Sequence, residues 1–276
     1  MKGCSSRREQ DLSAIALRSI LFGYLILLII LPLGHIFGEA FREGWSGFWQ
    51  SLQKAEALFT LKFTFALALF TAIVNAIAGT LTAYVLVRFP VKGKTILNAL
   101  VDLPFAIPTA VSGLMLLLLY GPQSPLGSWL GDRGIDIIYA IPGIVLAMIF
   151  VTFPFSIRSV QPLLLEMGQD KEEAAKTLGA SSWQTFQKVT LPMLWPGILS
   201  GFSLTFSRAL AEFGSVIIVA GNIPLQTQVA SVYIYGEVES FNMVGAASVS
   251  VVLLILSFTL LYAQNRWLAR KRRGDR

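Results

Sequence analysis

Long apolar runs alternate with short polar connections along this chain. Because a helix that crosses the hydrocarbon core of a bilayer needs about 20 mostly apolar residues, these runs predict an all-α membrane protein with six transmembrane helices. We expect a single domain over residues 1–276. The predicted spans cover residues 15–37, 60–87, 96–120, 138–157, 194–219 and 241–262.

Two of these runs are unusual. The run over residues 60–87 is long enough to tilt in the bilayer or to extend beyond it. The next run contains Asp102, Pro104 and Pro108. Because proline lacks a backbone N–H group and its ring clashes inside a helix, we expect the regular helix of this span to begin near Pro108.

The composition agrees with a membrane protein. The chain is 54% hydrophobic and 14% charged, and its mean hydropathy is +0.65. Most Lys and Arg residues lie near the two termini and in the connections around residues 88–94 and 158–188. Because basic residues mark the cytoplasmic ends of spans, both termini and the 158–193 connection are predicted to be cytoplasmic. The basic residues flank apolar spans and form no single face, so we expect lipid contacts and no nucleic-acid partner.

The polar connection over residues 158–193 has strong local helix signals. Asp170 is predicted to cap a short helix, with Glu173 in the reciprocal position. Gly179 can adopt the left-handed conformation that ends such a helix. A second helix should begin at Ser181, with Gln184 in the reciprocal capping position, and should stop at Pro192. The pattern therefore predicts two short helices with an elbow at Gly179 and an apolar side that docks on another protein. The apolar side consists of Ala174, Ala175, Leu178, Trp183, Phe186 and Val189.

This connection resembles the EAA loop of binding-protein-dependent ABC importer permeases. The family pattern has Glu-Ala-Ala, three residues, Gly, nine residues, an aliphatic residue, one residue, and Leu-Pro. Val189 stands where the family usually has Ile. In that family the loop is the coupling helix that sits in a cleft of a cytoplasmic ATPase. The residues to which the resemblance assigns this coupling role are Glu173, Ala174, Ala175, Gly179, Leu191 and Pro192.

The resemblance implies an assembly and a place for it. The architecture would be that of a type I importer permease in a bacterial inner membrane. The partners would be a homologous second permease (CysW-like), two copies of an ATPase (CysA-like) and a periplasmic sulfate/thiosulfate-binding protein. The chain contains no Walker-type G-x-x-x-x-G-K-[ST] pattern. We therefore expect no enzyme activity and no cofactor in this chain, with ATP and Mg bound by the partner ATPase.

Two further segments indicate a branch of the family. Residues 102–113 and 208–224 are similar to the sulfate/thiosulfate permeases (CysT or CysU type), and the second segment is shared with the molybdate branch. The expected function is therefore the permease subunit of an ATP-driven sulfate/thiosulfate importer. A molybdate/tungstate permease is the alternative within the family. A secondary anion transporter or channel is the alternative from another class, and it would need no ATPase.

Charged residues within an apolar span indicate either function or helix pairing, because a charge in hydrocarbon costs at least about 2.5 kcal/mol. Arg208 and Glu212 are four residues apart, so they share one helical face and can pair. Arg208 could meet an anion in the translocation path, with Ser207 nearby, or the pair could simply hold helices together. We favour the structural pair, because pairing neutralises Arg208.

The start of the helix after Pro108 is a second candidate for the anion path. Free N–H groups at a helix N-terminus attract anions, and Thr109 and Ser112 would add hydroxyl donors. A proline kink used for packing alone is the alternative. Gly197 and Gly201 are spaced so that another helix can approach closely. The single Cys4 and single His35 predict no metal site.

Overall fold

The computed structural model describes residues 17–274, with side chains to residue 267, and this part of the chain contains helices and no strand. The expected all-α membrane architecture is confirmed. Five helices are long and apolar enough to cross a membrane, and a pair of helices bent by 109° makes a sixth span if it is counted as one. The five are Leu17–Ala40, Ala55–Arg88, Ile141–Met167, Ser182–Leu210 and Met243–Trp267, and the bent pair is Lys94–Ala106 with Thr109–Tyr120.

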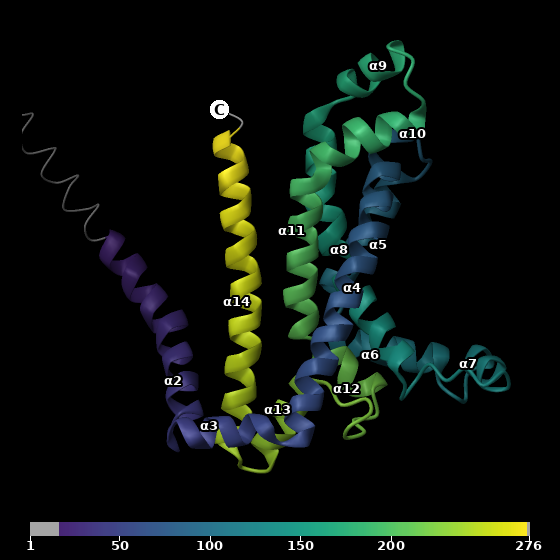
Figure 1. The fold of residues 1–276 in the computed structure, drawn as a ribbon. Helices are drawn as coiled ribbons and strands as arrows, with labels where there is room; N and C mark the ends of the chain where they lie inside the picture. The colour runs from purple at the N-terminus through teal and green to yellow at the C-terminus, as the bar shows by residue number, and fades with distance from the viewer. Residues whose placement is uncertain (1–16, 275–276) are drawn as a thin grey trace, which may run out of the picture.

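The start of the first span lies away from the body of the protein, and its end packs against α14 near α3 (Figure 1). It includes the π-helical turn η1 (Ile26–Ile30) and α2 (Leu31–Ala40), and none of its most apolar window is buried. The short helix α3 (Gly44–Gln53) follows and lies across the base of the molecule. Its Phe48 and Leu52 are buried against the body, whereas Trp45 and Trp49 are exposed.

Three long helices form the centre of the protein. They are α4 (Ala55–Arg88), α8 (Ile141–Met167) and α11 (Leu191–Leu210). Small residues let them approach: a Cβ on Gly201 would lie 2.9 Å from Ser156 Cα, and one on Gly197 would lie 2.7 Å from the Ser159 carbonyl oxygen. The close approach predicted for these two glycines is therefore confirmed, with α8 as the partner helix.

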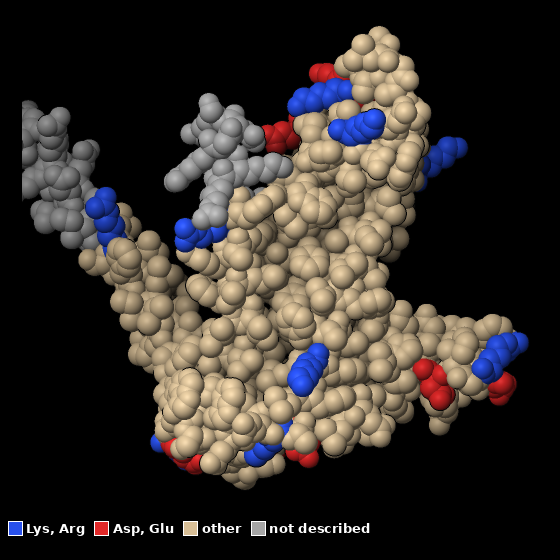
Figure 2. Space-filling view, in the orientation of Figure 1, with Lys and Arg blue, Asp and Glu red and all other residues tan. Residues whose placement is uncertain are grey.

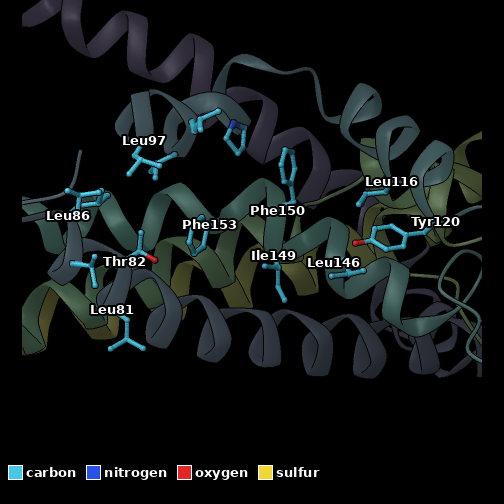
Figure 3. A pocket seen from close by; sticks show the side chains of 15 residues that line it. Leu81, Thr82, Leu86, Leu97, Leu116, Tyr120, Leu146, Ile149, Phe150 and Phe153 are labelled. Atoms are coloured by element: carbon cyan, nitrogen blue, oxygen red, sulfur yellow. The ribbon is translucent and has the colours of Figure 1, made fainter. Parts of the chain in front are cut away.

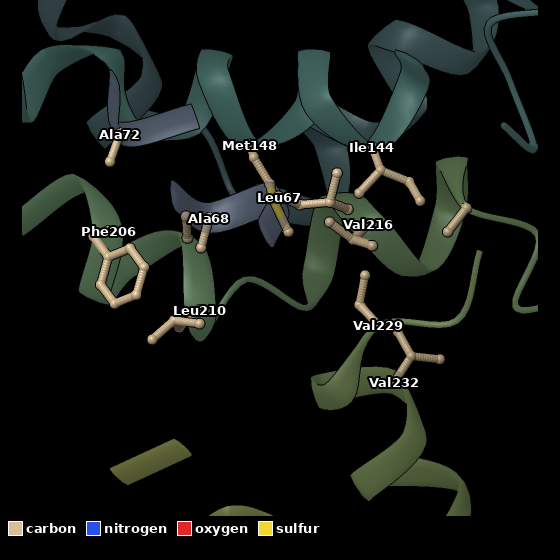
Figure 4. Packing of buried hydrophobic residues seen from close by; sticks show 12 residues of the cluster. Leu67, Ala68, Ala72, Ile144, Met148, Phe206, Leu210, Val216, Val229 and Val232 are labelled. Atoms are coloured by element: carbon tan, nitrogen blue, oxygen red, sulfur yellow. The ribbon is translucent and has the colours of Figure 1, made fainter. Parts of the chain in front are cut away.

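An apolar core joins these helices to the segments at the base. Figure 4 shows side chains from α4, α8 and α11 meeting Val216 and Val229 from the segments that follow α11. The last two helices, α13 (Ala230–Glu239) and α14 (Met243–Gly274), complete the base and the final span.

The chain turns sharply at Pro108, as predicted. α5 (Lys94–Ala106) ends just before it and α6 (Thr109–Tyr120) begins just after it. Pro104 lies inside α5, so a helix also precedes the turn. Beyond α6, the short helix α7 (Pro125–Gly131) is capped by Ser124 and projects sideways from the body (Figure 1).

The continuous fifth helix predicted over residues 194–219 is wrong. Helix α11 ends at Leu210, and a separate helix, α12 (Gly214–Val219), begins three residues after Ala211. The Glu212 side chain accepts a hydrogen bond from the Ser215 N–H group at 2.9 Å. The chain therefore starts a new helix there, because the carboxylate satisfies a donor of its first turn.

The polar connection is shorter than its predicted range of 158–193, because α8 continues as a helix to Met167. The connection contains α9 (Asp170–Thr177), α10 (Ser182–Thr185) and the π-helical η2 (Phe186–Thr190). It lies at the same end of the molecule as the start of the first span and the end of α14 (Figure 1). Of the basic residues expected at the termini, Lys2, Arg7, Arg8 and Arg276 lie outside the described residues.

Charged side chains gather at the two ends of the protein. On the face drawn in Figure 2 they lie near α9, around the base and at the tip of the α7 arm, and the band between the two ends carries almost none. Such an apolar band matches the hydrocarbon core of a bilayer, where an unpaired charge is costly.

Candidate functional site

The first turn of α9 differs from its prediction. Gln169 occupies the N-cap position and makes no side-chain cap, so the capping arrangement of Asp170 with Glu173 is wrong. Three acidic residues, Asp170, Glu172 and Glu173, lie in the first turn. Acidic side chains there stabilise a helix, because they interact favourably with the positive end of its dipole. Glu173 is exposed and Glu172 is buried. The helix therefore begins one residue earlier than predicted, with its acidic residues divided between solvent and core.

The elbow at Gly179 is confirmed. Its φ is +89°, in the region that favours glycine. The Ala180 N–H donates to the Ala175 carbonyl oxygen at 3.0 Å, and the Gly179 N–H donates to that of Lys176 at 2.9 Å. This pair of hydrogen bonds is the Schellman arrangement that closes a helix C-terminus.

The second helix begins as predicted but does not stop as predicted. Ser181 and Gln184 form the reciprocal capping box, with hydrogen bonds of 3.2 and 2.9 Å. Pro192 falls in the first turn of α11, and residues 182–210 remain helical throughout. The chain changes direction where η2 meets α11 (Figure 1). A proline next to a π-helical segment bends a helix without ending it.

The elbow presents apolar side chains to the outside. Leu178 is 90% exposed and Trp183 is 67% exposed, and Trp183 stacks on Phe186 with ring centroids 5.8 Å apart. Among the residues assigned to coupling, Glu173, Ala174, Gly179 and Pro192 are exposed, and Ala175 and Leu191 are half-buried. Large exposed apolar side chains on a charged loop are typical of a surface that binds another protein.

A contact that was not predicted from the sequence holds this loop. The Arg88 guanidinium donates from Nε to both carboxylate oxygens of Glu172, at 3.1 and 3.0 Å. Arg88 also donates to the carbonyl oxygens of Leu164 and Gly168, at 3.1 and 2.6 Å. The Thr190 hydroxyl donates to Glu172 Oε1 at 3.0 Å. We call Arg88, Glu172 and Thr190 the Arg88 cluster. In the sequence, Arg88 is only a basic residue at the end of a predicted span, and Glu172 is only one of several acidic residues in a polar connection. Neither feature indicates that the two residues form a buried pair.

The second candidate region is built around Glu212. Its side chain is fully buried and is paired with Arg208, with 2.7 Å between Oε2 and Nη1. Glu212 Oε1 accepts hydrogen bonds from the backbone N–H and the hydroxyl of Ser215, both at 2.9 Å. Arg208 keeps 32% of its side chain exposed. The predicted pairing of Arg208 with Glu212 therefore occurs as an ion-pair contact at Oε2, which accepts no hydrogen bond from the described residues, while Oε1 accepts both hydrogen bonds from Ser215.

Helix α6 crosses α12 beside this pair. A Cβ on Gly113 would lie 2.6 Å from the Ser215 carbonyl oxygen, and one on Gly214 would collide with Thr109 Oγ1. The structure thus brings Thr109 and the Glu212 region to one place. A Cβ on Gly214 would also lie 3.1 Å from the Ala110 nitrogen. The backbone of Gly214 therefore packs closely against one side of the α6 N-terminus.

Two hydroxyl groups in this region lack a protein partner. Ser112 is 1% exposed, and neither its Oγ nor the buried Oγ of Ser207 has a hydrogen-bond partner within the described part of the chain. A buried hydroxyl without a partner is unfavourable, so each such group calls for an explanation. Ser112 lies in the first turn of α6, and Ser207 lies next to Arg208 in the last turn of α11.

A cavity on another side of α8 has a different character. It measures about 780 Å³ and lies between α4, α5, α6 and α8 (Figure 3). Its walls are almost entirely aliphatic and aromatic, with Thr82 and Tyr120 as the polar exceptions. Such a surface suits lipid or another apolar helix and does not suit an anion. Among the described residues there is also no group of three or more His, Cys, Asp or Glu side chains that could hold a metal ion.

Comparison with known proteins identifies the family. Residues 75–274 match the model of the binding-protein-dependent transport system inner membrane component. The chain belongs to this family. Together with the apolar helices described above, this membership makes it a multi-pass membrane protein and a transport permease.

Individual relatives are similar over nearly the whole chain. The chain is 44% identical over 250 residues to a probable sulfate transport system permease protein cysT of Helicosporidium sp. subsp. Simulium jonesii, covering 91% of this chain and 93% of that protein. It is 39% identical over 265 residues to the sulfate transport system permease protein CysT of Escherichia coli (strain K12), covering 96% and 95%.

Solved structures share the fold at lower identity. One is a bacterial ABC transporter involved in the import of the acidic polysaccharide alginate, with a TM-score of 0.74 and 19% identity, covering 94% of this chain and 96% of that chain. Another is a bacterial alginate ABC transporter in complex with alginate pentasaccharide-bound periplasmic protein, with a TM-score of 0.76 and 19% identity, covering 96% of both chains. These likenesses show that the fold is that of ABC importer permeases.

Proposed function

We propose that this chain is the permease subunit of an ATP-driven sulfate/thiosulfate importer and forms half of its translocation pathway. The observation that carries the proposal is the similarity, over nine-tenths of the chain, to proteins named as sulfate transport system permeases. The same names favour sulfate over molybdate or tungstate. A secondary transporter or channel is disfavoured, because the family is a binding-protein-dependent one.

The elbow of α9 and α10 is proposed to dock on an ATPase. Its exposed Leu178 and Trp183 supply apolar area, and the exposed Glu173 supplies charge at the first turn of α9. We assign the coupling contact to Glu173, Ala174, Ala175, Gly179, Leu191 and Pro192, together with these two apolar side chains. Closure of the ATPase subunits on ATP would then move the elbow and, through it, the spans.

The remaining assignments follow from this assembly. The partners are a CysW-like second permease, two copies of a CysA-like ATPase, and a periplasmic sulfate/thiosulfate-binding protein. ATP and Mg are bound by the ATPase, so this chain needs no cofactor and has no catalytic site of its own. The elbow and both termini face the cytoplasm of a bacterium, and the base with α3 and α13 faces the periplasm.

The anion is proposed to pass the region where α6 crosses α12, next to the end of α11. Ser112 and Ser207 have buried hydroxyl groups with no partner in the described chain, and Thr109 lies at the α6 N-terminus. Arg208 keeps 32% of its side chain exposed and pairs with the buried Glu212. The three hydroxyl groups would supply hydrogen bonds to a tetrahedral dianion, and Arg208 would add positive charge only if its pair with Glu212, for which we favour a structural role, also meets the anion.

One experiment tests the proposal. A tagged copy is purified from the native membrane, its co-purifying ATPase and second permease are identified, and the complex is placed in proteoliposomes with the binding protein. We expect sulfate and thiosulfate to stimulate ATP hydrolysis and to accumulate in the lumen. Stimulation and uptake with molybdate alone would reject the sulfate assignment, and uptake without any ATPase would reject the importer class.

A further inference from the structure

Helix α9 is fastened to the protein by one buried side chain. Glu172 is 5% exposed, and it is the single buried residue of this fully described helix. The glycines that flank α9 are Gly168, with φ +64°, and Gly179, with φ +89°. A Cβ at either glycine would meet nothing within 4 Å in the described chain. Because glycine linkers permit many conformations, the chain connections alone do not fix the orientation of α9.

Arg88 connects this helix to two spans. It is the last residue of α4, and it binds Glu172 in the first turn of α9. Its other two hydrogen bonds go to the carbonyl oxygens of Leu164, in the last turn of α8, and Gly168, the C-cap of α8. The last carbonyl groups of a helix have no partner within the helix and attract cations. One guanidinium group therefore joins the ends of α4 and α8 to the start of α9.

Thr190 extends the connection to a third span. Its side chain is buried, and its hydroxyl donates to Glu172 Oε1. Thr190 is the last residue of η2, and α11 begins at the next residue. Glu172 thus receives hydrogen bonds from Arg88, where α4 ends, and from Thr190, just before α11 begins.

The burial of these groups makes the connection rigid. The side chains of Arg88 and Glu172 are each 7% exposed, so water does not compete for their hydrogen bonds. Removing one member of a buried ion pair leaves the other charge without compensation. The fork of the guanidinium group also fixes direction, which the single ammonium group of a lysine would not do.

We propose that the Arg88 cluster is the positioning element that makes a displacement of α9 move α4, α8 and α11 together. This inference rests on the proposed function, in which an ATPase moves the elbow. Glu173 and its exposed neighbours contact the ATPase, and Glu172, which points the other way, passes the movement to the spans. Without the cluster, the ATPase would still bind the elbow, and α9 would turn about its two glycines without moving the spans.

The test uses the complete importer in proteoliposomes with its binding protein and sulfate. The variants are Glu172→Gln, Thr190→Val and Arg88→Lys, and the matched control is Glu166→Gln, an exposed glutamate in the last turn of α8. Two quantities are measured on assembled complex: sulfate taken up per ATP hydrolysed, and hydrogen–deuterium exchange of the α9 amides.

We expect Glu172→Gln to assemble with the ATPase and retain basal hydrolysis, with uptake per ATP lowered at least about tenfold and exchange in α9 faster by a similar factor. Thr190→Val should lower uptake per ATP by about two- to fivefold. Arg88→Lys should fall between the two, and Glu166→Gln should match the wild type. A residue that only stabilises the fold would lower the amount of complex and leave uptake per ATP unchanged.

Unchanged uptake per ATP in assembled Glu172→Gln would overturn the proposal. If that variant does not assemble, the milder Thr190→Val decides by the same ratio, and wild-type values for its uptake per ATP and α9 exchange would overturn the proposal equally. The exchange measurement needs no substrate. A wild-type importer that moves no sulfate would therefore reject the proposed function, while α9 exchange would still decide whether the cluster fastens the helix.

Discussion

The guanidinium group of Arg158 on α8 binds both carboxylate oxygens of Asp102 on α5, with Nε–Oδ1 2.7 Å and Nη2–Oδ2 2.6 Å. Arg158 Nη2 also donates to the backbone carbonyl oxygen of Asn98 at 3.0 Å. The contact holds α5 against α8 a few residues before the turn at Pro108. It therefore sets the position from which α6 begins and crosses α12.

Replacing Asp102 tests this contact. Asp102 is 49% exposed, so the pair is only partly buried, and we expect it to be worth about 1 kcal/mol or less. We expect Asp102→Asn to lower the Tm of the purified complex by about 2 °C, measured by thermal unfolding in detergent. Asp136→Asn, at an exposed aspartate beyond α7, serves as the control and should not shift the Tm. Equal Tm values for the two variants would contradict the assigned role of the contact.

Gly179 provides a prediction about the elbow. Its φ of +89° imposes strain of about 1 kcal/mol or more on any side chain. No steric clash is added, because a Cβ there would be in open space within the described chain. We expect Gly179→Ala to reduce sulfate uptake in part, and Gly179→Asp, which also adds charge to the docking surface, to abolish it with the protein still in the membrane.

The control for Gly179 is Gly236→Ala, a glycine of α13 with an ordinary φ and equally open surroundings. It should leave uptake and membrane content unchanged. Wild-type uptake by Gly179→Asp would remove the assignment of this elbow as the coupling element.

Variants of Arg208 and Glu212 distinguish a structural role of this pair from a role in anion transport. Arg208→Leu alone leaves a fully buried carboxylate that retains its hydrogen bonds from Ser215, so we expect a loss of about 3 kcal/mol, at the low end for a broken buried pair. The double change Arg208→Leu with Glu212→Leu should recover most of this loss. It should still lack about 1 kcal/mol, because α12 loses the acceptor in its first turn.

Expression, ATPase activity and sulfate uptake are measured for both single variants and the double variant. Recovery of uptake along with folding in the double variant would support the structural pair, which we favour. A well-assembled double variant that hydrolyses ATP without uptake would show instead that Arg208 meets the anion.

Ser112 and Thr109 test the proposed anion path. Removing a buried hydroxyl that lacks a partner is neutral or slightly stabilising, so the Ser112→Ala change should not weaken the fold. We expect Thr109→Val with Ser112→Ala to raise the sulfate concentration needed for half-maximal transport several-fold, at unchanged amounts of assembled complex. Identical transport kinetics in proteoliposomes would favour the alternative, in which the turn at Pro108 serves packing alone.

Features decided by neighbouring residues could be predicted from the sequence. The elbow at Gly179 and the Ser181–Gln184 capping box depend on groups within five positions of one another, and both are present. The apolar runs likewise locate the long helices, because hydrophobicity over 20 residues decides whether a helix can cross a membrane. The restart of the helix after Pro108 follows from the chemistry of proline.

Features decided by distant residues could not be predicted in this way. Glu172 is turned inward by Arg88, which precedes it by 84 positions, and this moves the start of α9 away from the predicted cap. The break after Leu210 could not be predicted from hydropathy, because Val216–Val219 continues the apolar run. Hydropathy also gives no indication that the Glu212 carboxylate accepts a hydrogen bond from the Ser215 N–H group. Pro192 was predicted to end a helix that in fact bends there and continues.

The bend between η2 and α11 gives this part of the chain the form of a crank. Its short arm, Ser182 to Thr190, is about 13 Å long, and its long arm from Leu191 to Arg208 is about 26 Å long at the rise of an α-helix. If the two arms turn as one body, a shift of about 2 Å at Ser182 becomes about 4 Å at Arg208, in proportion to their lengths. A small stroke at the elbow would then be doubled at Arg208, near the end of α11.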